Sequence, residues 1–463
     1  MTDYEKFLES KKFSFNPVGF DAIHIPDMLF DWQRDVIKVA LKKGRFCLFT
    51  DTGTGKSFMQ IVFAHNVCMY TGDPVLILAP LAVTEQTKEE AEKLGIEVNV
   101  CRHQSETING INITNYDMLD HFDPGAFAGI VLDESSILKH FTSKTRTQII
   151  DSFAQTRYKL ACSATPSPND YMELGNHSEF MGVMTRTEML ATFFYHDGGD
   201  TAKWILKGHA RDKFWEWISE WAIAIRKPSE IGYSDDGYNL PKLNIEEIIV
   251  KSENGIDEDG QMMLVPSLAS TLSERRTARR ESMTDRCKTA ASLIEKEPDA
   301  QWLFWCDLNA ESEILTKLTG GVEVKGSDKR EYKSKSLLGF SHGIVRRLVS
   351  KPSIAGFGMN WQQCHNMVFV GLSDSYESMY QAIRRCYRFG QKKPVNVYII
   401  TSESEGAVRD NIARKEKQTE NVFKQLSKYS KAAIEKEIKK TYRQTDSYNA
   451  IVIMEVPEWL VSA

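Results

Sequence analysis

An apolar segment that runs into a glycine-rich turn constrains the fold of this chain more than any other feature. Arg45-Phe-Cys-Leu-Phe-Thr50 has the composition of a buried strand, and it continues into Thr-Asp-Thr-Gly-Thr-Gly-Lys-Ser at 50–57. Gly53 and Gly55 permit a tight backbone path. Backbone N–H groups in such a turn, at the start of a helix, point toward a bound anion. The segment therefore predicts a strand, a phosphate-binding turn and a helix in succession.

The turn has the residue types that hold a nucleoside triphosphate. Lys56 would reach the β- and γ-phosphates, and the Ser57 hydroxyl would join the coordination shell of Mg²⁺. The general P-loop pattern has glycine where this chain has Thr50, whereas the form Ala-x-Thr-Gly-x-Gly-Lys-Ser/Thr differs only in having alanine there. A Gly-x-Gly-Lys segment can also be a simple turn before a helix, so the assignment depends on further motifs.

Length and composition fit a globular protein of several domains. At roughly 150 residues per domain, 463 residues suggest about three units, or two large units with an insertion. Hydrophobic residues at 42% and charged residues at 26% argue against wholesale disorder. No apolar run reaches membrane-spanning length, and the polar N-terminus lacks a secretory hydrophobic core. We therefore expect no membrane partner and a cytoplasmic location.

Cysteine usage and net charge restrict the classes of partner. The eight cysteines contain no Cys-x-x-Cys pair, and several lie in apolar, strand-like runs, which predicts reduced core residues and not metal ligands. A net charge of −5 argues against a surface covered in positive charge for nonspecific nucleic-acid binding. Any nucleic-acid track must therefore be a local basic groove.

Short apolar runs alternate with amphipathic helical stretches. The first set lies at 46–49, 75–79, 130–132 and 160–162, and the second at 302–306, 345–349, 367–370 and 395–400. This alternation predicts two α/β lobes with parallel sheets flanked by helices. Between them, tryptophan and phenylalanine residues at mostly helical spacing predict an α-helical insertion, whose aromatic stripe is core packing or, alternatively, a base-stacking platform.

A second motif places two carboxylates at the end of an apolar strand. Ile130-Val-Leu leads directly into Asp133 and Glu134, and ligands bind at the carboxyl ends of strands in open α/β sheets. Asp133 would hold Mg²⁺ through water, and Glu134 would orient or deprotonate the attacking water. Paired acids can be a solvated turn, but their position downstream of the phosphate-binding turn favours catalysis.

Three further segments complete an ordered set of motifs. Leu160-Ala-Cys-Ser-Ala-Thr-Pro166 ends a strand in small hydroxyl residues; Gly356-Phe-Gly-Met-Asn360 and Gln381-Ala-Ile-Arg-Arg-Cys-Tyr-Arg-Phe-Gly-Gln391 follow in the second half. In this order the chain resembles the superfamily-two helicases, and the last two segments resemble their Swi/Snf branch. The resemblance covers about residues 25–425. Because no large accessory domain is recognisable, we expect a compact motor similar to bacteriophage or prophage members.

The resemblance implies ATP and Mg²⁺ as cofactors, bound in a cleft between two RecA-like lobes. Arg388 would be the arginine finger that neutralises charge on the γ-phosphate, with Arg385 as a second charge. A basic helix face that pairs with acids is the alternative for these arginines. Gln33, in Leu29-Phe-Asp-Trp-Gln-Arg34, would read adenine, or would be a surface glutamine. The predicted catalytic residues are Lys56, Asp133, Glu134, Arg385 and Arg388; the predicted nucleotide-binding residues are Gln33, Thr52, Gly53, Thr54, Gly55, Lys56, Ser57, Gly358 and Gln381; the predicted metal ligands are Ser57 and Asp133.

The resemblance also implies contacts with nucleic-acid phosphates in both lobes. The predicted contact residues are Pro80, Thr114, Asn115 and Ser327. Ser273-Glu-Arg-Arg-Thr-Ala-Arg-Arg280 pairs arginines on shared helical faces and is a DNA contact or a solvated helix face. Duplex DNA is the expected partner of a monomeric motor, and the sequence defines no protein partner.

Two departures from the family pattern leave the coupling of the motifs open. Asp-Glu-Ser-Ser at 133–136 replaces Asp-Glu-x-His, and Arg384 stands where the family usually has an acid. The predicted organisation is an N-terminal extension at 1–24, a first lobe at 25–170, a helical insertion at 171–240, an inter-lobe connection at 241–285, a second lobe at 286–425, and a C-terminal helix and tail at 426–463.

Three functions are compatible with these motifs. The favoured one is an ATPase, stimulated by duplex DNA, that translocates along DNA or remodels DNA and protein–DNA complexes. The second is a helicase that separates strands of RNA or branched DNA. It would have the same ATP site and would differ in the nucleic acid that it binds. An ATP-gated clamp with little turnover is the third, although a pure clamp does not need Glu134 or Arg388.

Overall fold

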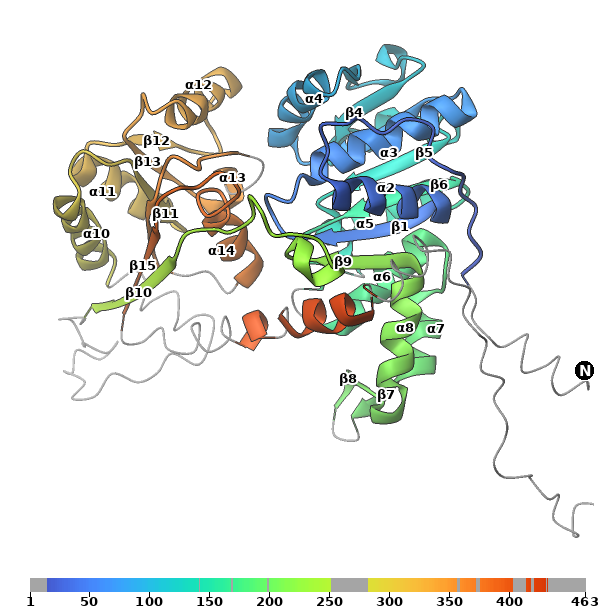
Figure 1. Ribbon diagram of the computed structural model, residues 1–463. Helices are drawn as coiled ribbons and strands as arrows, with labels where there is room; N and C mark the ends of the chain where they lie inside the picture. Colours follow the sequence, from blue (N-terminus) through green and yellow to red (C-terminus); the bar gives the residue numbers. More distant parts are fainter. Residues whose placement is uncertain are drawn as a thin grey trace, which may run out of the picture.

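Two parallel β-sheets organise the part of the chain that the structure describes. The computed structural model describes residues 15–140, 142–167, 170–197, 200–250, 282–355, 359–371, 375–402, 414–417, 420–429 and 431. The sheets belong to two α/β lobes that lie beside each other (Figure 1). The predicted fold class, two RecA-like parallel-sheet lobes in tandem, is confirmed.

The first sheet has seven strands in the order β3-β4-β2-β5-β6-β1-β9. Its strands are β1 (Arg45–Thr50), β2 (Val75–Ala79), β3 (Val98–Val100), β4 (Ile111–Asn115), β5 (Gly129–Asp133), β6 (Tyr158–Cys162) and β9 (Ala222–Ile225). Its main helices are α2 (Asp31–Lys43), α3 (Lys56–Thr71), α4 (Thr84–Lys93) and α5 (Lys144–Ser152). Apolar clusters fill both faces of the sheet, which explains why the strands read as continuous apolar runs.

The second sheet has six strands in the order β10-β15-β14-β11-β13-β12. Its strands are β10 (Leu243–Val250), β11 (Trp302–Cys306), β12 (Val322–Val324), β13 (Arg347–Ser350), β14 (Asn366–Val370) and β15 (Val395–Ser402). Its helices are α10 (Met283–Ser292), α11 (Asn309–Thr319), α12 (Arg330–Ser341), α13 (Pro352–Ala355) and α14 (Tyr376–Ile383). All of the paired strands in both sheets are parallel.

The described part of the segment predicted as a helical insertion contains three α-helices together with strands. These elements are α6 (Leu174–Met181), α7 (Arg186–Phe193), an antiparallel hairpin of β7 (Phe194–Asp197) and β8 (Asp200–Leu206), α8 (Arg211–Trp221), and β9. Strand β9 pairs with β1 and so belongs to the first sheet. The aromatic residues of α8, including Trp215 and Trp221, are buried in the core of the first lobe, so they are packing residues and not a stacking platform.

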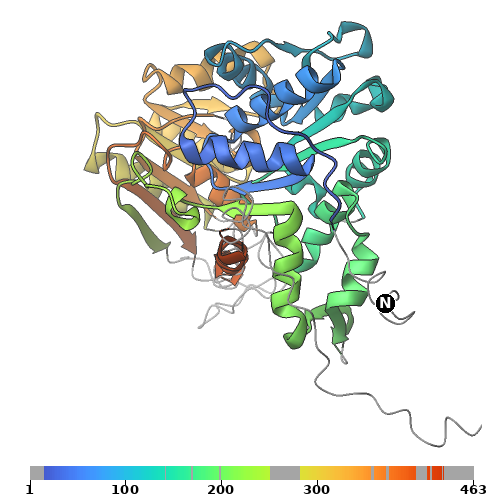
Figure 2. The same ribbon diagram turned by 45° about the vertical axis from the view of Figure 1, so that its right-hand side comes forward.

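Two other predicted segments contribute to the lobes in ways that the sequence did not indicate. Strand β10, within the predicted inter-lobe connection, pairs along its whole length with β15. Residues 420–429 are helical, and Val422, Phe423 and Leu426 are buried in the core of the first lobe, beside α8 (Figure 2). The arginine-rich stretch at 273–280 and the tail at 432–463 lie outside the described residues.

None of the described helices combines the length and the apolar character that a membrane span requires. Seven of the eight cysteines are buried, and Cys68 is partly exposed. The predicted placement of most cysteines in the core is therefore confirmed.

A buried ion pair inside the second lobe gives a stability prediction. Arg286 of α10 and Glu311 of α11 have fully buried side chains whose charged atoms lie 3.0 Å apart. Replacing Glu311 with alanine is expected to cost about 3–5 kcal/mol of unfolding free energy, because the guanidinium then stays buried without this carboxylate. Denaturant unfolding measures the loss. The matched control, Glu313→Ala, removes an exposed partner of Lys325 and should cost less than about 1 kcal/mol; equal losses would refute the expectation.

Candidate functional site

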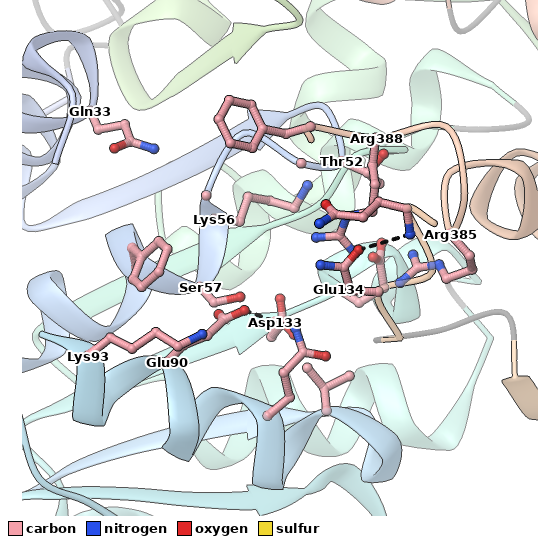
Figure 3. A pocket seen from close by; sticks show the side chains of 18 of the residues that line it. Gln33, Thr52, Lys56, Ser57, Glu90, Lys93, Asp133, Glu134, Arg385 and Arg388 are labelled. Atoms are coloured by element: carbon pink, nitrogen blue, oxygen red, sulfur yellow. Dashed lines mark hydrogen bonds between the residues drawn. The ribbon is translucent and has the colours of Figure 1, made fainter. Parts of the chain in front are cut away.

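The motif-bearing ends of the two lobes meet at a cavity of about 320 Å³. The first lobe contributes the turn between β1 and α3 and the carboxyl end of β5, and the second contributes α14 and the turn that follows it. Figure 3 shows Lys56, Asp133 and Glu134 facing the same space as Arg385 and Arg388. Segments more than 300 residues apart in the sequence, such as Lys56 and Arg388, therefore line one cavity.

The glycine-rich turn has the backbone of a phosphate-binding loop. Gly53 and Gly55 have φ of 81° and 79°, a region that strongly favours glycine, and α3 begins at Lys56. The Lys56 ammonium donates to the main-chain oxygens of Thr50 at 2.7 Å and Asp51 at 2.9 Å. The Thr54 hydroxyl donates to Asp51 O at 2.6 Å and so braces the turn. Burial lowers the pKa of Lys56, although nearby carboxylates oppose that effect.

Gln33 is tied to the glycine-rich turn and is buried, which excludes the alternative of a surface glutamine. Its amide nitrogen donates to Thr54 O at 2.7 Å, and its amide oxygen accepts from Phe30 N at 3.0 Å. A Cβ at Gly55 would lie only 2.4 Å from that amide nitrogen. Gln33 is therefore hydrogen-bonded to the glycine-rich turn. Its contact with adenine stays a prediction.

The two acids at the end of β5 are held in different ways. Asp133 accepts from the Gln60 amide at 2.7 Å, and its main-chain oxygen accepts from the Tyr116 hydroxyl at 2.6 Å. Glu134 has a φ of 58°, the one positive φ among described residues other than glycine. Burial raises the pKa of both carboxyls. Glu134 thus has a backbone conformation that is uncommon for a residue other than glycine, and its side chain lines the cavity.

Glu134 is contacted from both lobes. Its carboxylate accepts from the Ser163 hydroxyl at 2.8 Å and from the Gln381 amide of α14 at 3.1 Å. The Ser136 hydroxyl donates to the same carboxylate at 3.2 Å. Ser136, which belongs to the segment at 133–136 that departs from the family pattern, thus bonds Glu134 directly. Ser135, in the same segment, contacts the buried His177 ring at 3.0 Å.

Both arginines of the predicted catalytic set line the cavity from the second lobe. Arg385 donates to Gln381 Oε1 at 3.0 Å, and Arg388 donates to Met359 O at 3.3 Å. Neither forms an ion pair in the part of the chain that the structure describes, so they do not act as a basic face paired with acids. Burial, with the charge of Arg388, lowers the pKa of Arg385 to about 9. Two cations that line one cavity, the buried Arg385 and the partly exposed Arg388, suit a polyanionic ligand.

The remaining predicted residues are distributed around this cavity and beyond it. Thr52, Ser57 and Pro80 line the cavity, Thr114 and Asn115 are buried at the end of β4, and Ser327 is exposed on the loop between β12 and α12. Gly358 lies outside the described residues. Ser327 belongs to the second lobe and Thr114 and Asn115 to the first, and their contacts with nucleic acid stay predictions.

An aromatic group beside the cavity was missed by sequence reasoning. Tyr238 lies 5.4 Å from Phe389 and 5.5 Å from Phe30 between ring centroids, and all three rings line the cavity. They come from before α2, from the segment between β9 and β10, and from the turn after α14. Because the three aromatic residues are far from one another in the sequence, no local pattern could have revealed the group. Flat apolar rings at the edge of a phosphate site are suited to stacking a base.

The comparison with known families agrees with this geometry in the first lobe. Residues 30–174 match the family model described as DEAD/DEAH box helicase. The matched range includes the glycine-rich turn, Asp133, Glu134 and the Ser163–Thr165 segment. The chain therefore contains a DEAD/DEAH box helicase domain, which confirms the resemblance to superfamily-two helicases at that level. No curated protein sequence matches the chain.

Proposed function

We propose that this protein is a DNA translocase of the Swi/Snf type that hydrolyses ATP in the cleft between its lobes and thereby moves along duplex DNA or remodels protein–DNA complexes. The observation that carries the proposal is the single cavity lined by Lys56, Asp133 and Glu134 from one lobe and by Arg385 and Arg388 from the other. Nucleotide-dependent motors of this class need groups from both sides at the γ-phosphate. The helicase domain at 30–174 supports the general class.

The residues of the first lobe would bind the triphosphate. Lys56 would exchange its two main-chain acceptors for phosphate oxygens, since it already lies at the turn. Ser57 and Asp133 line the same cavity and offer the hard oxygen donors that suit Mg²⁺. When bound, Mg²⁺ would neutralise charge on the phosphates. Gln60 would keep the Asp133 carboxylate in place through its 2.7 Å hydrogen bond.

Glu134 and the arginines would serve the chemical step. Glu134 would orient the attacking water and accept its proton, and the raised pKa of its buried carboxyl favours that acceptance. Arg388 and Arg385 would stabilise the charge that develops on the transferred phosphoryl group. Because these groups come from both lobes, the closed cleft is the catalytically complete state. Opening after hydrolysis would shift the two nucleic-acid grips relative to each other.

Stimulation of ATP hydrolysis by different nucleic acids tests the proposed function. We expect duplex DNA to raise steady-state turnover of the purified protein well above that with single-stranded DNA or RNA. The matched control, Glu134→Gln, should lose turnover with every nucleic acid because an amide cannot accept the proton. Dominant stimulation by single strands or RNA would instead indicate a strand-separating helicase. Absence of turnover in the wild type would favour an ATP-gated clamp.

A further inference from the structure

One face of α14 carries a row of polar contacts to the first lobe. Glu377, Tyr380, Gln381 and Arg384 are spaced at i, i+3, i+4 and i+7, which places them on one side of the helix and its C-cap. Glu377 pairs with Lys139 and accepts from the Thr165 hydroxyl. Gln381 contacts Glu134, as described above. The row therefore reaches the Asp133–Glu134 motif and the Ser163–Thr165 segment of the first lobe.

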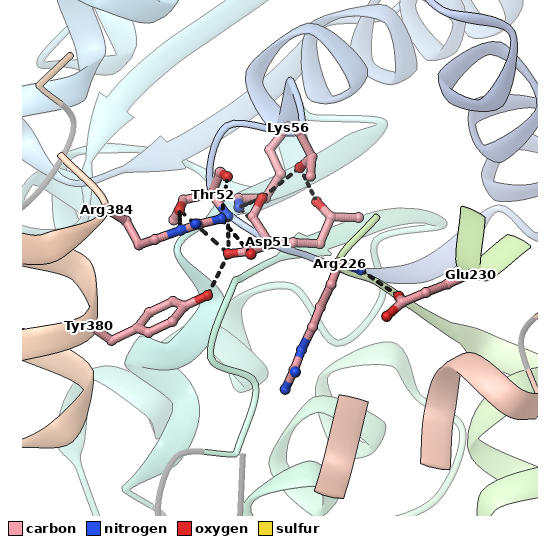
Figure 4. A network of polar contacts seen from close by, with 9 residues as sticks. Asp51, Thr52, Lys56, Arg226, Glu230, Tyr380 and Arg384 are labelled. Atoms are coloured by element: carbon pink, nitrogen blue, oxygen red, sulfur yellow. Dashed lines mark hydrogen bonds and ion pairs between the residues drawn. The ribbon is translucent and has the colours of Figure 1, made fainter. Parts of the chain in front are cut away.

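At the end of this row, Arg384 forms an ion pair with Asp51 in the glycine-rich turn (Figure 4). Arg384 also donates to the hydroxyl oxygen of Thr52 at 2.6 Å and to its main-chain oxygen at 3.1 Å. The Tyr380 hydroxyl donates to the Asp51 carboxylate at 2.5 Å. Arg384 and Asp51 are 8% and 9% exposed. Asp51 and Thr52, which are adjacent in the turn, are thus both held by side chains of the second lobe, and the Thr52 N–H donates to the Asp51 carboxylate at 2.6 Å.

The Asp51 carboxylate is charged in this setting. Burial by itself would raise its pKa, but Arg384, the Tyr380 hydrogen bond and Lys56 together outweigh burial, and the pKa is lowered. Removal of one member of a buried ion pair costs free energy, because the other charge then stays buried without its partner. Separation of the lobes would break this pair.

Close backbone contact accompanies the ion pair. A Cβ at Gly53 would lie 3.1 Å from Phe389 N and 3.5 Å from Arg388 Cβ. The segment that carries the predicted arginine finger is therefore seated directly on the glycine-rich turn. Arg384 lies one residue before Arg385 and four before Arg388 on that same segment.

We propose that the Asp51–Arg384 pair is a latch between the lobes, which holds the segment of Arg388 on the phosphate-binding turn before a nucleotide is bound. This ion pair depends on a departure of the chain from the family pattern, because Arg384 stands where the resemblance implies an acid. An acid at 384 would repel Asp51, whereas the arginine attracts it. Arg384 is thus a positioning residue, and its effect on catalysis, but not on lobe closure, rests on the proposed function.

Small-angle X-ray scattering of the nucleotide-free, full-length protein tests the latch without any need for hydrolysis. Arg384→Ala and the nearly isosteric Asp51→Asn should each increase the radius of gyration, and the double variant should open no further than either single variant. Arg384→Lys should retain most of the closure. The matched control, Arg346→Ala, removes an exposed arginine of the second lobe that pairs with Asp299, and should scatter like the wild type.

Wild-type scattering from folded Arg384→Ala, or strictly additive opening in the double variant, would overturn the latch. If Arg384→Ala fails to fold, Asp51→Asn decides the question by the same criterion. In an active enzyme, Arg384→Ala should lower kcat on the order of 10- to 100-fold, with a smaller change in KM for ATP, and Arg384→Lys should recover part of kcat. If the wild type hydrolyses no ATP, the proposed function fails, while the scattering result still tests the latch.

Discussion

ATP hydrolysis is expected to disappear when Lys56 is replaced by alanine. Lys56 carries the positive charge at the base of the glycine-rich turn, with its ammonium within 2.7–2.9 Å of two main-chain oxygens of that turn. Removal of one preorganised charge from such a site costs on the order of 10²- to 10³-fold in rate, and the loss of phosphate binding adds to it. The measurement is steady-state phosphate release with saturating nucleic acid.

The matched control for this variant is Lys88→Ala. Lys88 is an exposed lysine of α4 in the same lobe, so its replacement removes the same charge without touching the turn. The control should keep wild-type turnover and the same melting temperature. Hydrolysis that persists in Lys56→Ala would count against the whole assignment of the cavity.

Replacement of Arg388 with alanine is expected to remove turnover while ATP binding is largely kept. Arg388 faces the cavity from the second lobe, and its side chain donates only to Met359 O among the described contacts. An arginine that stabilises the transferred phosphoryl group contributes about 10³- to 10⁵-fold in kcat. Phosphate release gives kcat, and a fluorescent ATP analogue gives the dissociation constant.

A loss of nucleotide binding as large as the loss of kcat would show that Arg388 binds the ground state and is not a finger. Arg346→Ala is again the appropriate control, because that guanidinium is exposed and does not line the cavity. The Lys56 and Arg388 variants also distinguish the roles of the two lobes. Only the Lys56 variant should strongly weaken the binding of ATP.

The sequence predicted the elements whose signal is local. The run at 45–50 followed by Gly53 and Gly55 indicated a strand, a turn and a helix, and the structure has β1, the turn and α3 at those positions. The run before Asp133 likewise indicated β5. Apolar side chains in a parallel sheet are buried on both faces, so such strands are visible in the sequence alone.

Features that depend on distant partners were not predicted. Strand β9 is only four residues long and follows the aromatic helix α8 without a break, so its apolar residues read as part of that helix. Phe30, Tyr238 and Phe389 meet only through the tertiary fold. Arg384 departs from the family pattern, but its partner Asp51 is 333 residues away, and a single sequence contains no signal that joins them.

The helix at 420–429 means that the chain passes from one lobe to the other twice. It leaves the first lobe after β9 to enter the second sheet at β10, and after β15 it returns to bury Val422, Phe423 and Leu426 beside α8. Two separate straps therefore join the same pair of bodies. Two chain segments that join the same pair of lobes limit their separation more than one segment would.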